Sequence, residues 1–322
     1  MTLRLVVCSP VARESFDRRL REVPDVSLRW ASLAALPAAA READALVLSG
    51  TEYSAELAGV LQESANPCRW LQLLSAGYEL LPQYGVPSRV QASNAGSVWS
   101  PIVAEHVMAL MLALARRLPT VLAAQARCAW DGTIRNHMSQ LIDSHLVIVG
   151  MGSIGTELAR RARAFGMKVT GVSRRGLPHA DVDAMVPAGQ FHRALAQADF
   201  VAVAVPLSPE SSGLIGAAEL AAMPRHAVLV NVGRGPVVDH AALERALADG
   251  TIGGAALDVT DPEPLPPDSA LWRMPNVIVS PHLGGAAPER YYERLVSHVV
   301  GNVVRRTQGQ PPKDLIQIGP TP

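Results

Sequence analysis

The sequence contains few cysteines and few aromatic residues. Among its 322 residues, Phe, Trp and Tyr together make up 4%, and only three residues are cysteine. These three, Cys8, Cys68 and Cys128, are widely separated and fit neither a disulfide framework nor a CxxC metal site. We therefore expect reduced thiols at buried positions, where unpaired cysteines commonly behave as small hydrophobic residues. Reduced thiols are typical of a cytoplasmic protein.

An excess of charge and long hydrophobic runs are also missing. Lys plus Arg and Asp plus Glu number 29 each, so the chain lacks the positive charge expected of a nucleic-acid-binding protein. The longest clean apolar stretch, Val107 to Ala115, is far shorter than the roughly 20 residues needed to span a bilayer. The start of the chain offers only Leu5-Val6-Val7, too short for a signal-peptide core. We expect no nucleic-acid partner and no membrane partner.

What the sequence does contain is a regular alternation of β-like runs and helical segments. Its length and its 48% of hydrophobic residues favour two well-packed domains. Strands that alternate with helices imply parallel sheets covered by helices. In the first part of the chain, helical spacing covers 13–22 and 54–64. The strand-like runs there are 3–8, 45–49, 70–74 and 89–92.

A second series of strands and helices begins near Ser144. Its six strands suit a doubly wound dinucleotide-binding domain. Before it, Ser100-Pro101 supplies a cap residue followed by proline at the first helical position. This pair predicts a helix through about Leu118, which is apolar on almost every side and should be buried. The six strand-like runs are 145–149, 168–172, 200–205, 227–232, 254–258 and 277–280.

The closing segment, from Pro288 to about Thr307, is predicted to be helical and to return to the first domain. The predicted fold class is α/β, with two Rossmann-like or flavodoxin-like domains built on doubly wound parallel sheets. Residues 1–98 plus 287–322 are expected to form a discontinuous substrate domain. Residues 99–286 are expected to form the dinucleotide-binding domain.

Residues 150–155, GMGSIG, form a GxGxxG motif between an apolar strand and a helix. The glycines allow a tight turn, close approach of the backbone to a pyrophosphate, and close packing of helix on strand. The helix N-terminus adds free N–H groups and a positive dipole end. We therefore expect the motif to bind a dinucleotide, through Gly150, Gly152, Ser153, Ile154 and Gly155.

The next strand, 168–172, ends in Ser173-Arg174-Arg175. Enzymes that prefer NAD typically place Asp or Glu in this turn, where the carboxylate accepts hydrogen bonds from the ribose hydroxyls. Here the next acidic residue is Asp181. A carboxylate would repel a 2′-phosphate, whereas a hydroxyl and two guanidinium groups would attract it. These three residues favour NADP, used as NADPH, and NAD stays an alternative.

Three further segments follow predicted strands, where open α/β sheets build their sites. In residues 231–235, NVGRG, the glycines leave Arg234 on a tight loop that can present its guanidinium to a carboxylate or carbonyl. Asp258 is followed by the rigid acidic loop Asp261-Pro262-Glu263-Pro264. Residues 281–285, PHLGG, place His282 just past the last strand.

Together and in this order, the motifs resemble the D-isomer-specific 2-hydroxyacid dehydrogenase family. The resemblance covers nearly the whole chain. It includes LLSAGY at 73–78, SNAG at 93–96, VAEH at 103–106 and VPL at 205–207. The resemblance implies a reaction between a 2-keto acid and a D-2-hydroxy acid, in a cleft between the two domains that closes to exclude water.

The resemblance also implies a role for each matching residue. Arg234 would hold the substrate carboxylate and keto oxygen, His282 would act as general acid and base, and Glu263 would pair with His282. A neighbouring carboxylate stabilises the imidazolium form. In the cofactor site, Asp258 would lie beside the nicotinamide, together with Val205 and Pro206. The backbone N–H groups of Ser75, Ala76 and Gly77 would bind the substrate carboxylate from the other domain.

The motifs define the 2-keto acid core of the substrate but say little about the rest of it. An NADP-type turn resembles reductases of glyoxylate or hydroxypyruvate, and hydride transfer from NADPH with His282 as proton donor is the expected reaction. An NAD-dependent dehydrogenase of a bulkier 2-hydroxy acid is an alternative. Phosphoglycerate oxidation is less favoured, because the chain has no extra regulatory domain. In another class, some relatives bind dinucleotide as corepressors, but this chain has no appended basic arm.

A homodimer is expected from the resemblance, with Ile102–Leu118 and the segment after it as the interface. Trp130 is interpreted as a packing residue, with a cap on the partner's substrate site as the alternative. His106 lies in the apolar helix and is interpreted as a packed or interface histidine. No metal is expected, because the other histidines lack ligand spacing. These are His137, His145, His179, His192, His226, His240 and His298.

Overall fold

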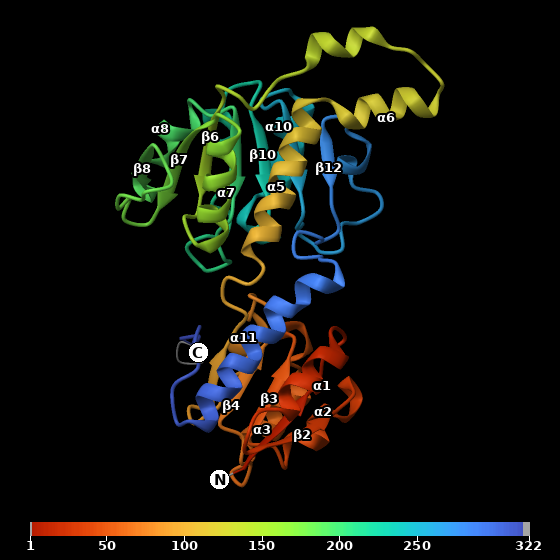
Figure 1. Ribbon diagram of the computed structural model, residues 1–322. Coiled ribbons are helices and arrows are strands. Elements are labelled where there is room, and N and C mark those ends of the chain that lie inside the picture. The colour runs from red at the N-terminus through yellow and green to blue at the C-terminus, as the bar shows by residue number, and fades with distance from the viewer. Residues whose placement is uncertain (1, 318–322) are drawn as a thin grey trace. The chain divides into compact units, whose positions relative to one another are not determined.

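In the computed structural model, which describes residues 2–317, the chain forms two compact units (Figure 1). Unit 1 holds the residues up to Trp99 and those from Ala287 onward, and unit 2 holds Ser100–Ala286. Each unit is a sheet of parallel strands covered by helices, which confirms the predicted α/β fold class.

Unit 1 contains a five-stranded sheet in the order β2-β1-β3-β4-β5. All of its strand pairs are parallel. β3 and β4 are buried at every position, as expected for strands covered on both faces. The strands are β1 (Leu3–Val7), β2 (Val26–Trp30), β3 (Ala45–Leu48), β4 (Trp70–Leu73) and β5 (Gln91–Ser93).

Alternate strand residues of unit 1 enter two separate cores. Leu5 and Val7 pack with α1 (Arg13–Arg21) and α11 (Glu289–Thr307), which lie side by side on one face (Figure 1). Val6 packs toward the opposite face. That face is covered by α2 (Leu36–Ala40) and α3 (Ala55–Gln62), and α4 (Leu80–Tyr84) also contributes to its core. The predicted closing helix therefore completes one of the two cores of unit 1.

A buried polar network joins α11 to the strands of unit 1. Asn302 donates to Gln72 Oε1 at 2.8 Å, and its own Oδ1 accepts from the backbone N–H of Lys313 at 2.8 Å. Ser93 also donates to Gln72 Oε1, at 2.9 Å. Since buried polar groups are costly when left without partners, these bonds hold the helix and the chain after it in one register against β4 and β5.

Unit 2 contains a seven-stranded parallel sheet in the order β12-β11-β10-β9-β6-β7-β8. The six predicted strands are present. The sequence analysis missed β8 here and β2 in unit 1, which are both short and partly exposed edge strands. The strands are β6 (His145–Val149), β7 (Lys168–Ser173), β8 (Ala184–Pro187), β9 (Phe200–Val203), β10 (Val228–Asn231), β11 (Gly254–Leu257) and β12 (Val277–Val279).

Helices cover both faces of this sheet. On one face, α5 (Ser100–Ala115) packs against α7 (Ser153–Ala164) and contacts β10, β11 and β12. The core of the other face includes α8 (Phe191–Leu195), α9 (Ala217–Ala222) and α10 (His240–Ala248). The expectation of one helix through Leu118 is wrong, since α5 ends at Ala115 and α6 (Leu118–Ala126) follows. Arg117 separates the two, with φ of 53°.

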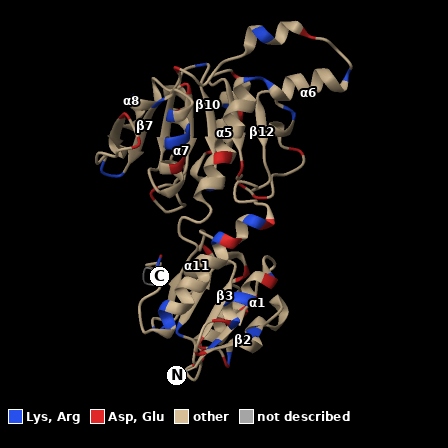
Figure 2. Cartoon of the chain, viewed as in Figure 1, with Lys and Arg blue, Asp and Glu red and all other residues tan. Residues whose placement is uncertain are grey.

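Charges of both signs occur on the helices of each unit (Figure 2). Cys8 and Cys68 are buried free thiols, whereas Cys128 is exposed, so the expected core position is wrong for that residue. No single helix within residues 2–317 is long and apolar enough to cross a membrane. In the same residues, only α5 and α6 taken together have the length and composition of a membrane span, and the two helices meet at a bend of 63°.

Candidate active site

The site residues predicted in unit 2 all lie at the carboxyl ends of its strands. Because the strands are parallel, these ends share one edge of the sheet, where α/β proteins bind ligands. The residues are Gly150 after β6, Ser173 at the end of β7, Val205 after β9, Arg234 after β10, Asp258 after β11 and His282 after β12.

Two glycines of the GxGxxG turn are required by the packing of the chain itself. Gly150 has φ of 109°, and a Cβ there would lie 2.6 Å from the carbonyl oxygen of Ala204. A Cβ on Gly155 would lie 2.1 Å from the carbonyl oxygen of Gly150. A side chain at Gly150 would therefore push against the segment after β9, and one at Gly155 would push α7 away from the turn.

Gly152 differs, because a Cβ there would meet nothing within 4 Å. It is the N-cap of α7 and provides no side-chain cap for the first N–H groups of the helix. Ser153 and Ile154 form the first turn, and Ser153 Oγ accepts a hydrogen bond from Ser100 at 2.8 Å. The open space beside a helix N-terminus fits the pyrophosphate of a dinucleotide.

The loop after β9 packs between this turn and the loop that carries Arg234. A Cβ on Gly150 would lie 2.8 Å from Val205 Cγ1, and one on Gly233 would lie 2.6 Å from the carbonyl oxygen of Val205. Pro206 is exposed, and its carbonyl accepts from Ser211 at 2.7 Å. The structure thus joins the glycine-rich turn and the arginine loop through Val205.

At the end of β7, Arg174 and Arg175 are both exposed. Ser173 Oγ accepts from the N–H of Gly176 at 3.1 Å, which makes the turn compact. Asp181, the next acid along the chain, is paired with Arg160 at 3.2 Å. The turn therefore presents two guanidinium groups on the surface.

The loop that carries Arg234 is held by a side chain of β10. Asn231 accepts from the N–H of Gly233 at 3.1 Å and donates to the carbonyl of Arg234 at 3.0 Å. A Cβ on Gly235 would lie 1.9 Å from the carbonyl oxygen of Thr260. The arginine loop therefore lies directly against the start of the acidic loop.

His282 and Glu263 form a close pair. His282 Nδ1 lies 2.7 Å from Glu263 Oε1, and both side chains are about half exposed. Since an ionised carboxylate only accepts, Nδ1 is the donor in this bond. His282 has φ of 54°, a left-handed conformation that is uncommon for a residue other than glycine and often marks functional sites. The structure therefore brings together the two residues that the resemblance pairs.

Asp258 is the buried acceptor around which the His282 turn is built. Its side chain is only 4% exposed, and it accepts from the N–H groups of Leu283 at 2.8 Å and Gly284 at 2.9 Å. Ser280 donates to the same carboxylate at 2.7 Å. Burial by itself raises the pKa of Asp258, but the hydrogen bonds from His106, Ser280 and the two backbone groups outweigh it, so this pKa lies below its ordinary value.

The sequence analysis did not single out Ser280, and it interpreted His106 only as a packed or interface histidine. Two features of the sequence could have pointed to these residues. Ser280 comes just after the strand β12, and His106 is a polar side chain in an otherwise apolar helix. Within residues 2–317, no group of three or more His, Cys, Asp or Glu side chains could hold a metal ion.

The predicted loop Ser75-Ala76-Gly77 lies in unit 1, after β4. Ser75 Oγ accepts from the N–H of Gly50 at 2.9 Å and donates to the carbonyl of Gly77 at 2.8 Å. Asn94 donates to the carbonyl of Ala76 at 2.8 Å. These bonds fix the conformation of the loop.

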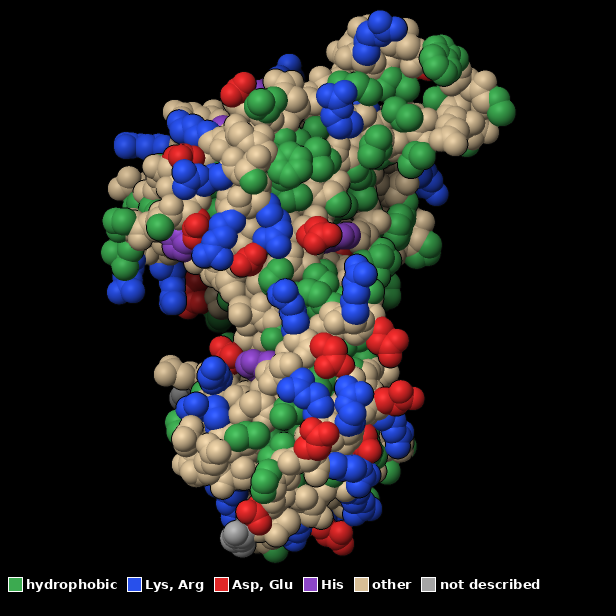
Figure 3. Space-filling view, viewed as in Figure 1, with side chains coloured by type: hydrophobic (Ala, Val, Ile, Leu, Met, Phe, Trp, Pro, Cys, Tyr) green, Lys and Arg blue, Asp and Glu red, His purple; other side chains and the backbone are tan. Residues whose placement is uncertain are grey.

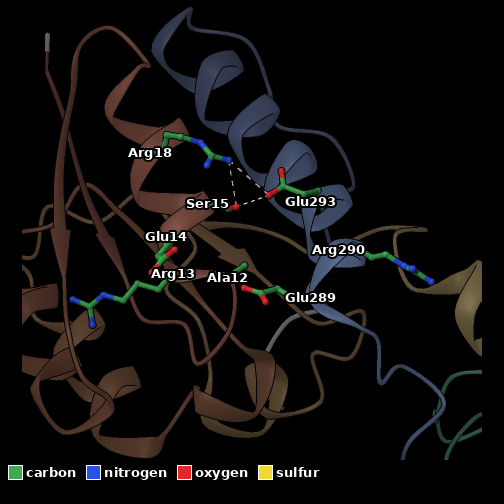
Figure 4. Close-up of a pocket in the computed structure, with 8 residues that line it drawn as sticks. All are labelled: Ala12, Arg13, Glu14, Ser15, Arg18, Glu289, Arg290 and Glu293. Carbon is green, nitrogen blue, oxygen red and sulfur yellow. Dashed lines mark hydrogen bonds and ion pairs between the residues drawn. The ribbon is translucent and has the colours of Figure 1, made fainter.

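Unit 1 also has a surface pocket of about 350 Å³ between the starts of α1 and α11 (Figure 4). Three of its polar side chains engage one another, since Ser15 hydrogen-bonds Glu293 and Arg18 lies 3.9 Å from the same carboxylate. None of the predicted site residues lines it. The lining residues are Ala12, Arg13, Glu14, Ser15, Arg18, Glu289, Arg290 and Glu293.

Residues 108–284, more than half of the chain, match the family model of the NAD-binding domain of D-isomer-specific 2-hydroxyacid dehydrogenases. The chain belongs to this family. The dehydrogenase is 34% identical over 280 residues to glyoxylate/hydroxypyruvate reductase B of Erwinia tasmaniensis, with 86% of each chain covered. It is an NAD(P)-dependent oxidoreductase that acts on the CH–OH group of 2-hydroxy acids.

Solved structures of the family share the fold of the dehydrogenase. A family member from Aeromonas salmonicida has a TM-score of 0.88 at 30% identity, covering 99% of this chain and 100% of its own. Another, from Xanthobacter autotrophicus in complex with NADPH and MES, has a TM-score of 0.83 at 29% identity and 99% coverage of both chains.

Replacing Asp258 by Asn tests the central position of this carboxylate. An amide has one acceptor oxygen where the carboxylate has two, so either the bond from the Gly284 N–H or the bonds from Leu283 and Ser280 are lost. We expect the midpoint of thermal unfolding to fall by roughly 4–8 °C at pH 7. Asp261→Asn, at an exposed position in the neighbouring loop, is the control.

The difference in thermal stability between wild type and Asp258→Asn should depend on pH in one direction. The pKa of Asp258 is lower in the folded protein than its ordinary value of 3.8. The stability that the carboxylate contributes is therefore present above that value and is lost as the pH falls through the folded-state pKa. The difference between wild type and Asp258→Asn should narrow in acid, and a constant difference would contradict this account.

Proposed function

We propose that the dehydrogenase reduces a small 2-keto acid, such as glyoxylate or hydroxypyruvate, to the D-2-hydroxy acid with NADPH. The observation that carries the proposal is the His282–Glu263 pair, 2.7 Å apart, at the sheet edge that also bears Arg234 and the glycine-rich turn. The glyoxylate/hydroxypyruvate reductase names of relatives such as the Erwinia enzyme support the choice of substrate.

In this mechanism the turn 150–155 would hold the cofactor, which when bound would supply the hydride that the keto carbon of the substrate requires. His282 donates the proton that the keto oxygen requires, from Nε2, because Nδ1 is engaged with Glu263. Glu263 fixes the orientation of the ring by accepting the hydrogen bond from Nδ1. Arg234 orients the substrate carboxylate and stabilises the charge that develops on the keto oxygen.

The remaining predicted residues are assigned to binding. The backbone N–H groups of Ser75, Ala76 and Gly77 are assigned to the substrate carboxylate. Asp258, Val205 and Pro206 are assigned to the nicotinamide end of the cofactor.

The preference for NADPH is supported by the turn after β7. Ser173, Arg174 and Arg175 offer a hydroxyl and two exposed guanidinium groups, which suit a 2′-phosphate better than the free ribose hydroxyls of NAD. The Xanthobacter structure, at 29% identity, was determined in complex with NADPH.

The substrate and cofactor are tested by following reduced nicotinamide absorbance with glyoxylate, hydroxypyruvate and bulkier 2-keto acids. NADPH should be oxidised well ahead of NADH. Replacing both Arg174 and Arg175 by Ala should raise KM for NADPH by about tenfold or more and leave KM for NADH nearly unchanged, since each guanidinium–phosphate contact is a charge-assisted bond. Arg225→Ala, at an exposed position on the same unit, is the control. A wild-type preference for NADH would contradict the cofactor assignment, and activity only on bulky acids would contradict the substrate.

The proton donor is tested by His282→Ala. We expect kcat to fall by about 10²–10⁴-fold, the contribution typical of general acid catalysis. NADPH affinity, measured by fluorescence titration, should change little, because the glycine-rich turn is intact. His226→Ala, which removes an exposed histidine paired with Asp199, should leave both quantities unchanged. Unchanged turnover in His282→Ala would remove His282 from the mechanism.

We also propose that the protein is a homodimer formed through the segment after α5. Leu122 and Trp130 in this segment are 62% and 102% exposed, and Leu118 and Ile142 are exposed as well. The interpretation of Trp130 as a packing residue is therefore wrong within the single chain. Hydrophobic side chains gather on this part of unit 2 (Figure 3). Exposed apolar patches of this kind commonly mark protein interfaces. The cytoplasmic location expected from the three free thiols stays a prediction.

Light scattering after size exclusion tests the dimer. The wild-type protein should have twice the mass of one chain, and a double variant Leu122→Glu with Trp130→Glu should shift toward the monomer, because two buried charges oppose association. Leu33→Glu, which alters an exposed leucine in unit 1, should leave the mass unchanged. A monomeric wild-type protein at micromolar concentration would contradict the proposal.

A further inference from the structure

We propose that His106 is a positioning residue that sets the place of His282 through Ser280 and Asp258. The inference rests on the proposed role of His282 as proton donor. All four residues belong to unit 2. His106 comes from α5, whereas the other three lie at the ends of β11 and β12.

The contacts of His106 carry the argument. His106 Nε2 lies 3.1 Å from Ser280 Oγ and 3.3 Å from Asp258 Oδ1. Ser280 Oγ lies 2.7 Å from the same Asp258 oxygen. Asp258 and Ser280 are buried, and the side chain of His106 is mostly covered. The imidazole edge therefore closes a three-membered polar cluster inside an apolar layer.

The direction of each hydrogen bond follows from the donors available. Asp258 accepts only, so the hydroxyl proton of Ser280 is directed to Asp258 Oδ1. Ser280 then has only lone pairs to offer His106. It follows that His106 Nε2 carries a proton and donates to Ser280 and Asp258. In this position His106 acts as a fixed N–H donor, whatever the state of its other nitrogen.

Asp258 connects the N–H group of His106 to the backbone of the His282 turn. The carbonyl of Asp258 accepts from the N–H of His282 at 2.8 Å, and its carboxylate accepts from the next two N–H groups, of Leu283 and Gly284. Three successive backbone donors thus meet Asp258, and the first of them, the N–H of His282, is shared with the carbonyl of Ser280 at 2.8 Å. Because His282 is in the left-handed region, where no preference of its own holds it, its backbone conformation depends on these bonds.

The packing around the cluster leaves little freedom for adjustment. A Cβ on Gly284 would lie 2.7 Å from Asp258 Oδ2 and 3.7 Å from His106 Cδ2. The turn therefore closes directly over the carboxylate and the imidazole. Loss of the His106 donor would let Ser280 and Asp258 rotate, and His282 would lose its alignment for proton transfer without loss of the substrate-binding groups.

The test compares His106→Gln with His106→Phe in the full-length protein. Gln places an amide N–H near the position of Nε2, whereas Phe keeps the ring volume and offers no donor. We expect kcat of His106→Phe to fall by about tenfold, as for one lost hydrogen bond to a charged group. The KM for the keto acid should stay within about twofold, because His106 makes no contact assigned to the substrate. His106→Gln should recover most of kcat.

Two further variants complete the design. Ser280→Ala interrupts the same link and should lower kcat without raising KM, even if His106→Phe fails to fold. His192→Phe removes a histidine that pairs with Glu219 at 2.9 Å outside the site, and it should leave kcat and KM unchanged. Thermal unfolding of each variant separates loss of stability from loss of positioning.

The outcomes distinguish this inference from the proposed function. A wild-type protein that reduces no keto acid overturns the proposed function, and the role of His282 with it. An active wild type with unchanged kcat in both His106→Phe and Ser280→Ala overturns the inference alone. Equal losses in His106→Gln and His106→Phe, or a loss confined to KM, also overturn it, since the donor would then not be what matters.

Discussion

The arrangement of the site depends on one constraint, the parallel direction of every strand in unit 2. Because all seven strands run the same way, loops separated by more than a hundred residues in sequence end at one edge of the sheet. The sheet alone therefore places the glycine-rich turn after β6 and the His282 turn after β12 at the same edge. The direction in which each site side chain points must still be determined by local hydrogen bonds. Asn231 and Asp258 do this, each by accepting backbone N–H groups of the loop that it holds.

Much of this could be predicted from the sequence. The GxGxxG turn could be predicted because backbone contacts dictate two of its glycines, Gly150 and Gly155, the second lying against the carbonyl of the first. The α/β class followed from buried strands whose residues are nearly all apolar, as in β9 and β10. The pairing of Glu263 with His282 was implied by the family resemblance, and the two side chains are 2.7 Å apart in the structure.

Other features were beyond the sequence for physical reasons. The edge strands β2 and β8 have one neighbour each and remain partly exposed. β2 alternates apolar and polar residues, and the apolar run of β8 is only four residues long and ends in proline. The break between α5 and α6 depends on the left-handed conformation of Arg117, a residue with no strong preference for it. His106 was interpreted as a packed or interface histidine. The periodicity of a helix indicates which of its faces is buried, but it does not indicate which residues that face contacts. Its contact with Asp258 joins residues 152 positions apart.

The discontinuous course of unit 1 has a consequence for the synthesis of the protein. Residues Leu295, Val296, Val299 and Val303 of α11 complete the core that Leu5, Val7 and Phe16 begin. During translation, this core must wait until the whole of unit 2 has left the ribosome. Unit 2 is one continuous segment and needs no later residue for its sheet. Unit 2 can therefore fold before unit 1 is complete, although synthesis begins with unit 1, and the first strands made present an uncovered apolar face that is open to chaperones until α11 has been made.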